Sequence, residues 1–96
     1  SMAGFDVSES SDFNLEVYPN PSEGNINLNV SDFQGGNVTI SLWNAMGQQV
    51  INLYQGEVQT GNRTFNFDLN NITPGLYYIR FINDNNKTTV VRFMKS

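Results

Sequence analysis

Carboxylates are the main side chains left for acid–base chemistry, because the 96 residues include neither His nor Cys and nothing in the sequence clusters Tyr or Lys. Ser-His and Cys-His nucleophiles are therefore excluded, as are the usual His/Cys sites for zinc, haem and iron–sulfur clusters. The carboxylates beside predicted turns and strand ends are Asp32, Glu57, Asp68 and Asp84. No spacing fixes one of them beside another, and such residues most often cap turns. The sequence predicts a protein that is not an enzyme and that needs no cofactor or metal.

Aromatic side chains are the next candidates for chemistry, in this case for binding. Tyr18, Trp43, Tyr54 and Tyr78 would suit a platform for a sugar or a protein, but we favour the interpretation that they cover the edges of a sandwich. The oxygen-rich stretch 83–86 is interpreted as a turn, because it lacks the alternating acidic ligands and the closing Glu of an EF-hand loop, and a weak Ca²⁺ site in this loop stays open as the alternative.

The charge of the chain narrows the choice of partners. Nine acidic residues against five basic ones give a net charge of −4, so nucleic acid is a disfavoured binding partner, because the chain would repel the phosphate backbone. Four of the five basic residues follow position 79. Residues 1–12 are small, polar and acidic, and we expect a tag remnant (Ser1-Met2) and a flexible linker there. A single domain is expected over residues 13–96.

Apolar and polar residues alternate from Phe13 onward, which is typical of half-buried antiparallel strands. Between the alternating runs lie Gly, Pro and Asn, the residues of turns. The pattern predicts seven strands, at about 13–18, 25–30, 37–43, 48–54, 63–69, 76–82 and 87–94. Short strands at this spacing indicate an all-β, seven-stranded antiparallel immunoglobulin-like β-sandwich.

The last two strands divide into two faces by the same alternation. The inner face is assigned to Tyr77, Ile79, Phe81, Val91 and Phe93, and the outer face carries a basic stripe of Arg80 and Arg92. The turn Pro74-Gly75 before Tyr77 is similar to a tyrosine corner, in which the Tyr hydroxyl bonds to a backbone group upstream.

Four segments in order resemble one known family. Val17–Ile26, with Pro19, Asn20, Pro21 and Gly24, resembles the opening "YPNP…G" signature of the C-terminal sorting domain of the type IX (Por) secretion system of Bacteroidetes. Ile40–Val50, with Gly47, is similar to its strand–turn–Gly hairpin. Leu69–Arg80, with Pro74, Gly75 and Tyr77, and the ending Lys87–Lys95 are similar to its last two segments.

The resemblance implies a non-catalytic secretion signal. Such a domain follows an N-terminal cargo, which reaches the periplasm separately and is then passed through the outer membrane to the cell surface or the medium. A surface sortase-like peptidase typically removes the domain, and we expect the cut near residues 5–12 or further upstream.

The docking surface for the translocation machinery is expected on the last strand. Its candidate residues are Lys87, Arg92, Phe93 and Lys95, and an open edge there would also allow two copies to pair or exchange strands. Two alternatives stay open from the sequence: a carbohydrate-binding or adhesive module, and a fibronectin-like spacer of a secreted protein.

Overall fold

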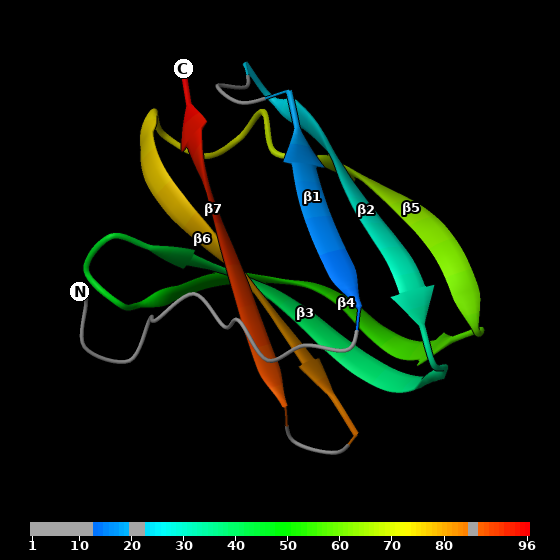
Figure 1. The fold of residues 1–96 in the computed structure, drawn as a ribbon. Coiled ribbons are helices and arrows are strands. Elements are labelled where there is room, and N and C mark those ends of the chain that lie inside the picture. Colours follow the sequence, from blue (N-terminus) through cyan, green and yellow to red (C-terminus); the bar gives the residue numbers. More distant parts are fainter. Residues whose placement is uncertain (1–12, 20–22, 85–86) are drawn as a thin grey trace.

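The computed structural model describes residues 13–19, 23–84 and 87–96, which form two antiparallel sheets packed face to face (Figure 1). Sheet A has the order β1-β2-β5, and sheet B has the order β4-β3-β6-β7. The strands are β1 (Asn14–Tyr18), β2 (Asn25–Phe33), β3 (Gly36–Asn44), β4 (Gln49–Val58), β5 (Gly61–Asp68), β6 (Gly75–Asn83) and β7 (Thr88–Lys95). The predicted all-β sandwich of seven antiparallel strands is confirmed.

All seven predicted strands are present, and β2 and β4 are longer than expected. A bulge lies between Val30 and Phe33 in β2, where Asp32 takes a positive φ of 60°. The backbone N–H of Asp32 donates to Oδ1 of Asn62, 3.1 Å away. The bulge therefore lets β2 continue and places Phe33 in the core, although Asp32 interrupts the alternation.

The core fills the space between the two sheets. Three phenylalanine rings close one end of it: Phe13, Phe33 and Phe81 lie with centroids 5.1–5.6 Å apart. The residues assigned to the inner face of β6 and β7 are buried, apart from Val91, which is half-buried and packs against the core. The alternation in the sequence therefore predicted these two strand faces correctly.

The first and last strands lie side by side on one flank of the sandwich, although they belong to different sheets. Both run in the same direction in Figure 1. Phe13 therefore lies at the opposite end of the sandwich from Lys95.

Phe81 and Phe93 are the largest fully buried side chains of the described core, and Phe81 contacts the ring cluster with Phe13 and Phe33. We expect Phe81→Ala to lower the free energy of unfolding by about 3–5 kcal/mol, because it removes the ring and leaves a cavity. Urea denaturation measures this change. Val50→Ala, at a side chain that is 40% exposed, is the control and should change stability by less than about 0.5 kcal/mol. Equal effects of the two substitutions would contradict the assignment of the core.

Candidate functional site

The first sequence motif ends β1 and begins β2. Tyr18 is the last residue of β1 and is joined to Pro19 by a cis peptide bond, whereas Asn20 and Pro21 lie outside the described residues. Gly24 is buried, and its carbonyl accepts a hydrogen bond of 2.9 Å from the backbone N–H of Leu69. A Cβ atom at Gly24 would collide with the side-chain amide of Asn70. A side chain at position 24 would therefore have to displace the amide of Asn70, at the start of the third motif.

The second motif forms the hairpin between β3 and β4. The carbonyl of Asn44 accepts from Gly47 N–H at 3.1 Å, and the side-chain oxygen of Asn44 accepts from the N–H groups of Met46 and Gln48 at 2.9 and 3.0 Å. Gly47 has a φ of 84°, a conformation that other residues rarely adopt. The sequence Asn-Ala-Met-Gly thus fixes this turn through one Asn side chain and one Gly.

The third motif is a tyrosine corner. The Tyr77 hydroxyl donates to the backbone carbonyl of Thr73 at 2.7 Å and lies 3.1 Å from the hydroxyl of Thr73. Tyr77 is only 6% exposed, and its ring stacks on Phe93 of the fourth motif with centroids 5.9 Å apart. The bond anticipated from the Pro-Gly-Leu-Tyr spacing is present, and Thr73 is its acceptor.

The four motifs form one connected part of the structure although they are separate in the sequence. Gly24 joins the first motif to the third, and Tyr77 joins the third to the fourth. Trp43 of the second motif pairs across strands with Tyr78 of the third. The motif residues therefore hold together β2, β3, β6, β7 and the crossing between the sheets.

The expected docking residues divide into an exposed pair and a buried pair. Lys87 and Arg92 are exposed, whereas Phe93 is 1% exposed and Lys95 is 7% exposed. Residues 89, 91, 93 and 95 of β7 face sheet A. Phe93 therefore belongs to the core, and the Lys95 side chain lies on the same inner face. The Lys95 ammonium donates to the Ser96 carbonyl at 3.3 Å. Of the four candidates, Lys87 and Arg92 therefore present exposed side chains, whereas Phe93 lies on the inner face, as its parity predicts, and Lys95 is buried at the end of the same row.

The basic stripe on the outer face of sheet B is tied to an aromatic ring. The Arg80 guanidinium lies 5.0 Å from the centroid of Trp43, and the Trp43 indole N–H donates to Ser41 Oγ at 2.8 Å. Nε of Arg80 is buried without a hydrogen-bond partner. Arg92 lies beside Tyr78 in the next row of the sheet. The sequence places these residues on one face, but it does not show which strands are neighbours.

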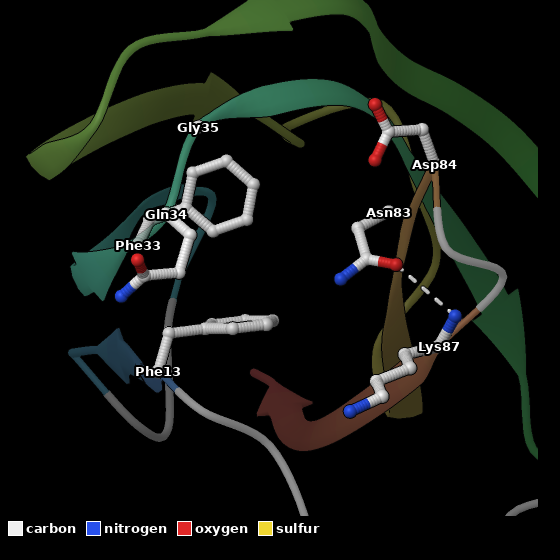
Figure 2. A pocket seen from close by; sticks show the side chains of 7 residues that line it. All are labelled: Phe13, Phe33, Gln34, Gly35, Asn83, Asp84 and Lys87. Carbon is white, nitrogen blue, oxygen red and sulfur yellow. Dashed lines mark hydrogen bonds between the residues drawn. The ribbon is translucent and has the colours of Figure 1, made fainter.

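A pocket lies at the end of the sandwich where Phe13 meets the turn before β7 (Figure 2). Phe13 and Phe33 line one side, and Asn83, Asp84 and Lys87 line the other. The Lys87 backbone N–H donates to the Asn83 side chain at 3.1 Å, and the Asp84 carboxylate accepts from Asn37 N–H at 3.4 Å. These polar groups serve the β6–β7 hairpin and its contact with β3.

The model of the family described as "Secretion system C-terminal sorting domain" matches residues 16–96. The chain belongs to this family. Sorting domains of type IX secretion occur in Bacteroidetes and imply export across the outer membrane, to the cell surface or beyond. No curated protein matches the chain.

One solved structure resembles the sorting domain at low identity. It is the crystal structure of a β-glucosidase from Listeria innocua in complex with glucose, with a TM-score of 0.49 and 16% sequence identity. The match covers 91% of the present chain but 16% of that chain, so the sorting domain spans a small part of the enzyme's length.

Two carboxylates of the sorting domain accept hydrogen bonds from neighbouring asparagines. Asp68 accepts from the backbone and side-chain N–H groups of Asn70, and Asp84 accepts from Asn37. Within residues 13–19, 23–84 and 87–96, no group of three or more His, Cys, Asp or Glu side chains is arranged to hold a metal ion. No helix in this described part is long and apolar enough to cross a bilayer.

The four aromatic residues considered for a platform do not form one. Trp43 and Tyr78 lie on the outer face of sheet B, where Tyr78 is only 3% exposed. Tyr54 packs on Phe65 with centroids 4.9 Å apart, and Tyr18 lies on the other sheet. The four rings therefore share no surface, because Trp43 and Tyr78 lie on the outer face of sheet B, Tyr54 packs on Phe65, and Tyr18 lies on sheet A.

The hydrogen bond of the tyrosine corner can be tested directly. We expect Tyr77→Phe to lower the free energy of unfolding by about 1 kcal/mol, because the ring still packs on Phe93 while the bond to Thr73 is lost. Urea denaturation of the variant is compared with that of Tyr18→Phe, at a ring that is 42% exposed. An unchanged midpoint for Tyr77→Phe would show that the corner bond contributes nothing to stability.

Proposed function

We propose that this sorting domain is a non-catalytic signal that directs an N-terminal cargo through the type IX outer-membrane machinery, after which a surface sortase-like peptidase removes it. The observation that carries the proposal is the family match over residues 16–96. It is supported by the connected motif residues, which hold a small sandwich together without help from another domain. The proposed cut at residues 5–12 or upstream lies outside the described residues.

The proposal assigns the docking of the machinery to β7 and its flanks. Lys87 lies just before the strand and Arg92 lies on its outer face, and both are exposed. Arg80, on the neighbouring strand β6, adds a further positive charge to the same outer face of sheet B. The buried side chains Phe93 and Lys95 hold β7 in place. Pairing or exchange of strands between two copies is part of the same proposal, since β4 and β7 are the two edges of sheet B.

Export of a reporter tests whether the domain is a sufficient signal. Residues 1–96 are fused behind a periplasm-targeted fluorescent protein in a bacterium that has the type IX system. We expect fluorescence at the surface or in the medium, and we expect it to be lost in a translocon mutant. Fluorescence held in the periplasm, with the domain folded, would overturn the proposed function.

Charge reversal tests the docking assignment separately. We expect Lys87→Glu combined with Arg92→Glu to reduce export of the reporter about tenfold or more, equivalent to about 1.4 kcal/mol of lost interaction. The control is Arg63→Glu, which reverses one exposed positive charge on β5, away from β7. Both fusions are first checked for wild-type denaturation midpoints. Normal export of the double variant would exclude this surface while leaving the sorting function intact.

A further inference from the structure

The outer face of sheet A is built almost wholly from polar side chains. Its five asparagines are Asn14, Asn25, Asn27, Asn29 and Asn66, and they share the face with Glu16, Tyr18, Ser31, Thr64 and Asp68. Asparagine is disfavoured in strands, and exposed strand positions usually carry Thr, Val or aromatic residues. When residues with a low propensity for strands recur on one surface of a sheet, that surface is a candidate for a function.

Hydrogen bonds between strands fix the orientation of the central side chains. Asn66 Nδ2 donates to Asn27 Oδ1 at 3.0 Å, and Thr64 Oγ1 donates to Asn29 Oδ1 at 3.0 Å. These bonds leave the amide nitrogens of Asn27 and Asn29 and the amide oxygen of Asn66 for an external ligand. Donors and acceptors that are already ordered lose little conformational entropy on binding.

The first strand adds two different groups to this array. Register places Tyr18, Asn27 and Asn66 in one row across the three strands, and Glu16, Asn29 and Thr64 in the next. The Tyr18 side chain is 42% exposed and Glu16 is exposed. We call these six residues the amide face. From standard strand spacings they cover roughly 10 by 7 Å, which is enough for two sugar rings.

The functional groups of the amide face indicate which class of ligand it can bind. It offers amide donors and acceptors, a hydroxyl, a carboxylate and one aromatic ring, and none of its six residues is Lys or Arg. An anionic polymer is disfavoured by Glu16, with Asp68 in the adjoining row. A protein partner would need the large apolar or Arg anchors of an interface, and Tyr18 is the single candidate.

We propose that the amide face binds a neutral oligosaccharide. The Tyr18 ring stacks on the C–H face of one sugar, while the free amide groups of Asn27, Asn29 and Asn66 and the Glu16 carboxylate bond to its hydroxyls. The site lies on sheet A, away from the β7 surface proposed for docking. Sugar binding and export are therefore separate activities of opposite faces.

Affinity electrophoresis of residues 1–96 tests the proposal. Native gels are cast with dissolved hydroxyethyl cellulose, laminarin, xylan or mannan, and with dextran sulfate as an anionic comparison. We expect retardation in at least one neutral gel and none in dextran sulfate. Asn27→Ala and Tyr18→Leu should each weaken the apparent affinity about tenfold or more, and Asn66→Thr gives a second test that keeps a residue favoured in strands.

The matched control is Asn52→Ala, which removes an exposed asparagine from β4 on the other sheet and should retain binding. Each variant should keep the wild-type denaturation midpoint, and the asparagine variants, which lie outside the four sorting motifs named above, should export the fluorescent reporter normally. Absence of retardation in all four neutral gels would overturn the proposal, as would retardation that Asn27→Ala and Tyr18→Leu leave unchanged. Either result would leave the sorting function untouched, because export is measured separately.

Discussion

The Tyr77 side chain is buried, so its hydroxyl needs a hydrogen-bond acceptor, and the carbonyl of Thr73 provides it. That bond fixes the path of the chain where it passes from β5 in sheet A to β6 in sheet B. β6 is a central strand, paired with β3 on one side and with β7 on the other, so its position determines the register of both. The Tyr77 ring also stacks on Phe93 and so ties β7 to the same corner.

The sorting motifs are therefore requirements of the fold as much as sites of contact. Gly24 lies against the Asn70 side chain, and Gly47 occupies a turn position of positive φ that favours glycine. Neither glycine offers a side chain that a receptor could contact. Under the proposed function, the translocation machinery would recognise the shape that these residues stabilise, together with exposed charges such as Lys87 and Arg92.

The strands, the faces of β6 and β7 and the tyrosine corner could all be predicted from the sequence, because each depends on alternation or on spacing within a short segment. Contacts between distant strands could not. The bond between Asn27 and Asn66 requires knowing that β2 and β5 are neighbours, and a single sequence does not contain that pairing. The burial of Lys95 could not be predicted for a related reason: its pairing with Gly75 extends the sheet to the last residues, and that pairing is not visible in a single sequence.

The two flanking strands β1 and β7 run in the same direction, and each is bonded along its length to a neighbour in its own sheet. Consider a force that pulls on the Lys95 end of β7 while a cargo pulls in the opposite direction on the Phe13 end of β1. This force acts along the axes of both strands. Such a force slides β1 and β7 against their neighbours and strains their ladder bonds together rather than one after another. The sandwich is therefore oriented to resist mechanical traction, the load that hauling a folded cargo through a pore would impose.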